Sequence, residues 1–210
     1  MSDVITLAEK LKKQFPQKLP PVHLWNPPLS GDMDMRIAAD GKWFHEGDEI
    51  KRHSLVKLFS SILKREHDEY FLVTPVEKWR IKVDCAPFVI VQCEVLDQDI
   101  FVEDGTGGSE GNTSSVLCLT TNTEDKVLVD REHPIWVETS GGDMDENSSE
   151  ELLPYVIVRD NLPGLINRNT YYQLVDIALD DKQSFQEGDE VYINSGEEKF
   201  LLNPKASSKR

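Results

Sequence analysis

Two arginines at matching places in the sequence have the type and spacing best suited to a chemical role. Arg52 and Arg168 lie 116 positions apart, each near the start of a segment predicted to be a helix, Ile50–Leu63 and Ile166–Leu179. A cation at the start of a helix opposes the helix dipole, so a carboxylate or a bound anion should compensate it. Neighbouring carboxylates are one explanation; they are Asp48, Glu49 and Asp160. The other is that both arginines grip one phosphate or carboxylate from two sides.

We therefore expect an anionic ligand between two related units of the chain. The candidate ligand-binding residues are Arg36, Arg52, Lys78 and Arg168. A strongly acidic protein needs such a local positive site, because its overall field opposes the approach of an anion.

Other polar stretches carry weaker signals for chemistry. The loop Gly105–Gly111 is rich in glycine but is followed by a predicted strand rather than by the helix of a phosphate-binding loop. Asp32 and Asp34 lack a third metal ligand nearby, and His45–Glu49 lacks the histidine spacing of a zinc helix. We expect no catalytic residue, no metal site and no cofactor, and the sequence favours a non-catalytic protein without excluding an enzyme.

The two helical segments also organise the fold. Their sequences are similar at most apolar positions, and the first carries an i, i+3, i+4, i+7 stripe at Leu55, Leu58, Phe59 and Ile62. The predicted core anchors are Leu58, Phe59, Leu174 and Val175, and the predicted N-caps are His53 or Ser54 and Asn169 or Thr170. Since a strand precedes each helix and a hairpin follows it, the pattern predicts a duplicated unit whose two copies superpose.

The rest of the chain divides around these helices. Residues 1–30 read as an amphipathic helix, Asp3–Phe15, and a proline-rich arm; residues 31–85 form a first α+β unit, and residues 86–204 form a second, β-rich unit. Residues 205–210 are a basic tail. Two acidic or glycine-rich segments, 103–114 and 140–151, are predicted to be surface loops that folding does not require.

Charge and cysteine content limit the partners and the compartment. The formal net charge of −15 repels phosphate backbones, so we expect neither nucleic acid nor an anionic membrane surface as a partner. Three cysteines form no paired framework, which is typical of reduced intracellular thiols. Because no apolar run has membrane-spanning length and no signal peptide is evident, we expect a cytoplasmic protein.

Six short stretches carry a family resemblance. They are Gly31–Ile37, Trp43–Phe44, Leu55–Phe59, Leu72–Lys78, Val83–Val89 and Tyr171–Val175. Together they resemble the bacterial family called domain of unknown function 1285, over roughly residues 24–203. The resemblance implies a duplicated α+β core, a C-terminal part superficially like pleckstrin-homology folds, a pocket for a nucleotide-like ligand at the domain interface, and a role in signalling. The two acidic loops depart from the family pattern.

The sequence therefore predicts an α+β protein of two tandem related units, with antiparallel sheets and one main helix in each. Its favoured role is non-catalytic binding of a nucleotide-like anion in bacterial signal transduction. One alternative is a hydrolase acting on a small phosphorylated compound, with Asp32, Asp34 or Glu77 as general base. Another is a protein-interaction module that uses a sheet edge or its Trp and Tyr side chains. The oligomeric state is left open.

Overall fold

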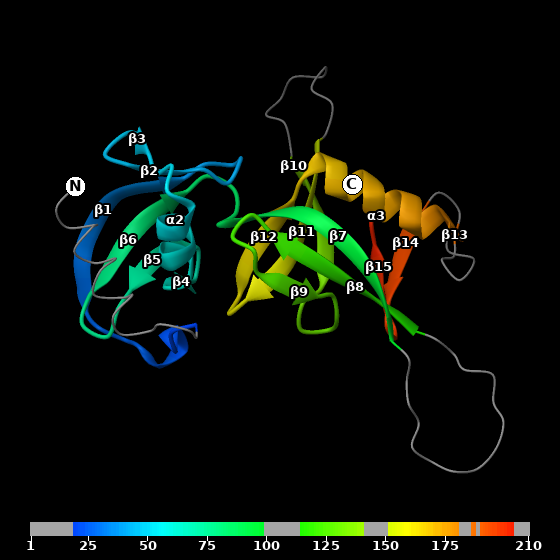
Figure 1. Cartoon of the computed structure of the whole chain (residues 1–210), viewed down its shortest axis with the longest axis horizontal. Coiled ribbons are helices and arrows are strands. Elements are labelled where there is room, and N and C mark those ends of the chain that lie inside the picture. Colours follow the sequence, from blue (N-terminus) through cyan, green and yellow to red (C-terminus); the bar gives the residue numbers. More distant parts are fainter. Residues whose placement is uncertain (1–18, 99–113, 141–150, 181–185, 188–189, 204–210) are drawn as a thin grey trace, which may run out of the picture. The chain divides into compact units, whose positions relative to one another are not determined.

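A computed structural model describes residues 19–98, 114–140, 151–180, 186–187 and 190–203. The chain separates into two compact units. The first unit contains residues 1–88 and 159–163, and the second contains residues 89–158 and 164–210. Each unit combines a six-stranded sheet with one main helix (Figure 1). The predicted α+β class with two tandem units is confirmed.

In chain order, the helix of the first unit follows three strands and precedes three more. Its elements are η1 (Val22–Leu24), β1 (Leu29–Ile37), β2 (Trp43–His45), β3 (Asp48–Glu49), α2 (His53–Ser60), β4 (Leu63–Glu66), β5 (Glu69–Val73) and β6 (Lys78–Val83). The strand order is β3-β2-β1-β6-β5-β4. Neighbouring strands are antiparallel except for the central pair, β1 and β6, which is parallel. That parallel pair departs from the antiparallel expectation.

Alternation along the strands gives this sheet a core face and an outer face. On β1, Met35 and Ile37 are buried while Arg36 between them is exposed. Trp43 lies beside Ile37 on the core face and stacks on Phe59 of α2, with ring centroids 6.4 Å apart. Side chains on one face of a helix and one face of a sheet thus form a single apolar layer. The opposite, outer face carries the polar residues of β1, β5 and β6.

The second unit is mostly sheet. Its elements are β7 (Phe88–Gln98), β8 (Ser114–Thr121), β9 (Lys126–Leu128), β10 (Ile135–Ser140), β11 (Glu151–Arg159), β12 (Leu162–Ile166), α3 (Arg168–Asp180), β13 (Gln186–Glu187), β14 (Glu190–Ser195) and β15 (Glu198–Leu201). The six-stranded sheet has the order β10-β11-β12-β7-β8-β9, and β13-β14-β15 form a second sheet. β14 lies against β8 and β15 lies against β10, while α3 packs on β14.

A buried polar bridge joins the two sheets of the second unit, and close packing tightens the six-stranded sheet itself. The buried Ser195 hydroxyl donates to the Val129 carbonyl at 2.6 Å and accepts from the Leu117 N–H at 3.0 Å. Gly164 allows a close approach on β12, since a Cβ there would lie 2.9 Å from Val158 Cγ2 and 3.0 Å from Ile90 Cδ1. A side chain at residue 164 would therefore overpack the core.

Both helices are shorter than the sequence pattern predicts. α2 ends at Ser60 and Leu63 already begins β4, because the Ser60 and Ser61 hydroxyls donate to carbonyls three residues earlier and satisfy the last turn. Phe59 and Leu174 are fully buried, as predicted. Leu58 and Val175 are only partly buried, so their assignment as core anchors is wrong.

The two units differ in strand order. The strands before and after α2 belong to one sheet, whereas those after α3 form a sheet separate from that of β12. The prediction that the two copies superpose with matching strand order is therefore wrong, although both units have the same class. The predicted helix Asp3–Phe15, the loop Gly105–Gly111 and the basic tail lie outside the described residues, as do residues 103–113 and 141–150 of the two predicted loops.

Candidate functional site

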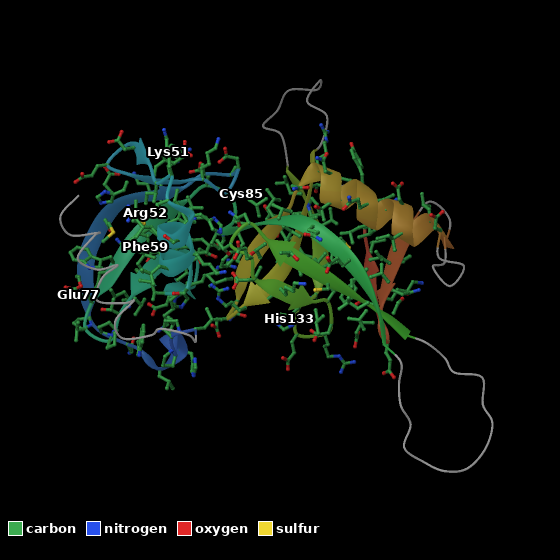
Figure 2. All side chains as sticks on the ribbon, viewed as in Figure 1. Lys51, Arg52, Phe59, Glu77, Cys85 and His133 are labelled. Carbon is green, nitrogen blue, oxygen red and sulfur yellow. The ribbon has the colours of Figure 1, made fainter. Side chains whose placement is uncertain are left out.

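The amino end of α2 carries exposed cations, and no side chain of the described residues caps it. Arg52 is the N-cap residue, with φ −79° and ψ 101°, and its side chain makes no capping hydrogen bond. The first turn of α2 contains no acidic residue. Lys51 and Arg52 are both exposed and lie at the same end of the first unit (Figure 2). Positive charge therefore coincides with the positive end of the helix dipole, which suits an anion.

No carboxylate of the described chain forms an ion pair with Arg52. Glu49, the last residue of β3, acts electrostatically on Lys42, and together with Asp40, the stronger influence, it raises the pKa of that amine. The simpler explanation for the charge of Arg52 was compensation by a neighbouring carboxylate, Asp48 or Glu49. Among the described residues, neither carboxylate forms an ion pair with Arg52. Lys51 was missed from the sequence, although it directly precedes Arg52.

The amino end of α3 is built differently. Asn167 accepts a hydrogen bond from the Thr170 N–H on its side-chain Oδ1 at 2.8 Å, so this helix has an ordinary N-cap. Arg168 is the first helical residue and is exposed. The first helical residues, His53 and Arg168, are 115 positions apart, so the two arginines occupy different helix positions. The predicted N-caps are wrong for both helices.

Arg36 is held in an exposed ion pair. Its Nε lies 2.8 Å from Asp84 Oδ1 and Nη2 contacts the other carboxylate oxygen, while the guanidinium lies 5.9 Å from the Phe44 ring centroid. The hydrogen bond from Arg36 lowers the pKa of the Asp84 carboxyl. Because β1 and β6 run parallel, Arg36 lies beside Lys82 at the carboxyl ends of these strands. The Nε and Nη2 donors of Arg36 are therefore already engaged by Asp84.

Lys78 belongs to a cluster on the outer face of the first sheet. Its ammonium lies 5.0 Å from the Phe71 ring centroid and 2.8 Å from Glu66, which also pairs with Lys64 at 3.1 Å. The hydrogen bond from Lys78 lowers the pKa of the Glu66 carboxyl. Next to them, Arg80 pairs with Asp32 and Glu69 at 3.0 and 2.9 Å. These charges neutralise one another over a buried aromatic ring.

The structure does not bring the four predicted site residues together within either unit. Arg36 lies at the carboxyl end of the β1–β6 pair, and Lys78 lies beside Leu29 at its amino end. Arg168 belongs to the second unit. A joint site of Arg52 and Arg168 stays a prediction. Within the first unit, Arg52 is the predicted residue whose charge is not already engaged.

The other polar candidates have structural partners or no cluster. Asp32 is ion-paired with Arg80, and His45 lies 3.9 Å from Glu46. The described residues contain no group of three or more His, Cys, Asp or Glu side chains suited to a metal ion. Burial is the main cause that raises the pKa of the Cys93 thiol, to about 11, so this thiol is unreactive near neutral pH. None of the three cysteines forms a disulfide.

The excess negative charge is confined to one part of the chain. Residues 1–88 contain 13 acidic and 14 basic residues, a formal net charge of +1. Residues 89–210 contain 25 acidic and 9 basic residues, a formal net charge of −16. The small hairpin tip 159–163 adds one charge of each sign to the first unit. The charges of the first unit nearly cancel, so they do not repel an anion that approaches α2.

Two family models match most of the chain. "Domain of unknown function (DUF1285), N-terminal domain" matches residues 20–86, and "Protein of unknown function (DUF1285), C-terminal domain" matches residues 101–202. A crystal structure of a DUF1285 family protein from Silicibacter pomeroyi DSS-3 is 39% identical and has a TM-score of 0.75, covering 95% of this chain and 93% of that chain. A second, from Shewanella baltica OS155, is 28% identical with a TM-score of 0.46, covering 69% and 91%. No curated protein matches.

Proposed function

Because this chain belongs to the DUF1285 family, whose description assigns no activity, its function has to be argued from its own residues, and we propose that it is a non-catalytic protein that binds a small, nucleotide-like anion. The binding site is the amino end of α2, with Arg52 as the principal contact and Lys51 beside it. In a cell, such a protein senses the ligand in signal transduction.

The position of Arg52 carries the proposal. It is an N-cap residue without a capping side-chain bond, in a helix whose first turn contains no carboxylate. The N–H groups of a first helical turn have no intrahelical partners, so they and a guanidinium can bind the same phosphate. Arg36 and Lys78 satisfy their charges in ion pairs and serve the fold rather than the ligand.

The charge distribution supports the first unit as the binding unit. Residues 1–88 are close to neutral, whereas an anion approaching residues 89–210 meets a net charge of −16. Arg168 lies in this acidic part, at a helix end that Asn167 already caps. We therefore assign Arg168 a smaller contribution than Arg52, and its own variant tests whether it contributes.

A cytoplasmic location forms part of the proposal. Cys85, Cys93 and Cys118 form no disulfide, which is the state expected in a reducing compartment. Among the described residues, no helix has the length and apolar character needed to cross a membrane. Nucleotides and related phosphorylated signals are dissolved in that compartment, where a neutral binding surface on an otherwise acidic protein can reach them.

Calorimetric titration at low salt tests the proposal with a panel of mononucleotides, cyclic dinucleotides and inorganic phosphate. Arg52→Ala should weaken binding of the best ligand at least tenfold, which is about 1.4 kcal/mol. Lys57→Ala is the matched control, because it removes a cation from the last turn of the same helix, and its affinity should stay within about twofold of the parent. The loss of affinity for Arg168→Ala should lie between the losses for Arg52→Ala and Lys57→Ala.

Two results would refute the assignment. If no member of the panel binds the parent protein, the anion-binding function is wrong. If Arg52→Ala and Lys57→Ala weaken binding equally, the ligand responds to the general charge of the unit rather than to the amino end of α2.

A further inference from the structure

The six-stranded sheet of the second unit has an open edge. That edge is β9, the last strand in the order β10-β11-β12-β7-β8-β9, and among the described residues β9 pairs only with β8. The strand at the opposite edge, β10, lies against β15 instead. Figure 1 shows β9 beside β8 at the margin of the sheet. An open edge presents backbone N–H and C=O groups to which a further strand can add.

The register of β9 shows which of its backbone groups point outward. On either side of β9, the Asp125 carbonyl and the Val129 N–H are bonded to β8, each at 2.9 Å. In an antiparallel pair, bonded positions alternate with positions whose N–H and C=O groups point to the other side. Lys126 and Leu128 occupy the alternate positions. Their N–H and C=O groups therefore point away from β8, toward the open edge.

The side chain best able to block this edge lies over the sheet instead. A lysine that extends outward from an edge strand is a common obstacle to strand addition. Here Lys126 Nζ lies 3.5 Å from Glu94 Oε2 of β7, so its chain crosses β8 and leaves the edge. Leu128, two residues on and on the same face, is 45% exposed. An incoming strand would meet an apolar side chain rather than a charged one.

The edge strand is fixed at both ends. Before it, the Thr121 hydroxyl accepts from the Thr123 and Asp125 N–H groups at 3.2 and 3.0 Å. After it, the buried Ser195 hydroxyl donates to the Val129 carbonyl at 2.6 Å. A strand that is already held in place loses little conformational freedom when a partner pairs with it, which favours binding.

The charge around β9 favours a cationic partner. Residues 122–134, which contain β9 and its flanking turns, include four acidic and two basic residues. Both basic side chains are already paired, Lys126 with Glu94 and Arg131 with Glu198 at 3.2 Å. Residues 89–210 as a whole carry a net charge of −16. A second copy of this acidic edge is repelled, whereas a basic segment is attracted.

We propose that β9 binds an extended, cationic peptide of a partner protein by strand addition. The backbone of the peptide pairs with the outward N–H and C=O groups of Lys126 and Leu128. An apolar side chain of the peptide contacts Leu128, and basic side chains at its ends reach the turns that carry the exposed Glu124 and Glu132. This gives the second unit a partner surface of its own, independent of the anion site at α2.

Fluorescence anisotropy tests the proposal with a labelled peptide that has a valine–threonine–valine centre and lysines at each end. Lys126→Pro should weaken its binding about tenfold or more, because proline removes an outward N–H while leaving the ladder with β8 intact. Lys126→Ala is the matched control, since it loses the same side chain but keeps the N–H, and it should bind at least as tightly as the parent. A peptide with glutamate in place of lysine should not bind.

Hydrogen exchange followed by nuclear magnetic resonance supplies a second measurement, which needs no variant. In the peptide-free protein, the N–H groups of Lys126 and Leu128 should exchange rapidly and that of Val129 slowly. The lysine peptide should slow exchange at Lys126 and Leu128 and leave Val129 unchanged. This alternation is the signature of strand pairing and is not expected from a peptide held by charge alone.

Four results would overturn the proposal. The lysine peptide could fail to bind, or Lys126→Pro and Lys126→Ala could bind it equally with unchanged melting temperatures. Slow exchange at Lys126 and Leu128 in the peptide-free monomer would mean that the chain covers its own edge. Slow exchange that appears only as protein concentration rises would mean that the occupant is a second copy.

Discussion

The two units manage charge and helix ends in opposite ways. In the first unit, cations and carboxylates are nearly equal in number and pair across the outer face of the sheet, with Lys78 and Arg80 lying over Phe71. In the second, acidic residues outnumber basic ones by 16. The first unit leaves its helix without a capping side chain, while the second caps α3 with Asn167.

This difference shows why whole-chain charge is a poor guide to ligand preference. The net charge of −15 is the sum of +1 for residues 1–88 and −16 for residues 89–210. Fields of exposed charges are screened over about 8–10 Å at physiological salt. A ligand near α2 therefore responds mainly to the charges of that neighbourhood rather than to the net charge of the whole chain.

The largest expected effects come from the two buried helix anchors. Phe59→Ala removes the ring that stacks on Trp43 and should destabilise the first unit by about 3–5 kcal/mol, and Leu174→Ala should destabilise the second by about 2–5 kcal/mol. Hydrogen exchange followed by mass spectrometry separates the two responses, peptide by peptide. Leu58→Ala is the control, with a smaller cost because Leu58 is only partly buried. Equal costs for Leu58 and Phe59 would contradict this account of the core.

Substitutions at the starts of the two helices should differ in their stability cost by about 1 kcal/mol. Asn167→Ala loses the cap of α3 and should cost roughly 0.5–2 kcal/mol of stability, measured by denaturant unfolding. Arg52→Ala loses no capping bond and removes a cation from the positive end of α2, so stability should stay level or rise by a few tenths of a kcal/mol. A loss for Arg52→Ala as large as that for Asn167→Ala would make Arg52 a structural residue.

Added salt should change the stability of the two units differently, because their net charges differ. Raising sodium chloride from about 20 mM to about 500 mM shortens the Debye length to a few ångströms and relieves repulsion among the acidic side chains of the second unit. Exchange protection of the second unit should then increase by less than about 1 kcal/mol, while the first unit, whose charges attract one another, should stay level or lose protection. The same response in both units would show that the sequence-based charge difference has no energetic consequence.

The smallest effect concerns Glu66, whose pKa is lowered by the hydrogen bond from Lys78. Its pairing stabilises the fold at a pH above the ordinary glutamate value near 4.5, and this contribution is lost as pH falls through the lower folded-state pKa. Glu66→Gln should therefore cost under about 1 kcal/mol at pH 7 and progressively less toward pH 3. Asp68→Asn is the control, because its side chain is 99% exposed. A cost for Glu66→Gln that does not depend on pH would rule out this ion pair.

Local patterns in the sequence determined much of the element order. The hairpin turned at residues 39–41, the β5–β6 hairpin around Pro75, and the helices with Phe59 and Leu174 inward all follow from alternation, turn residues and the 3.6-residue period. These signals act between residues close in the chain, where the backbone geometry itself fixes which side chains share a face. The family resemblance rested on stretches of the same local kind.

Tertiary structure alone decided the features that depend on distant residues. The parallel pairing of β1 with β6, the ion pair of Arg36 with Asp84 across 48 positions, and the bridge from Ser195 to Val129 have no local signal. The same holds for the site: two arginines that match in sequence take different helix positions, because Asn167 caps α3 and no equivalent side chain caps α2. A helix end is set by whichever group can satisfy its unpaired N–H and C=O groups, and that competition is resolved only in the folded chain.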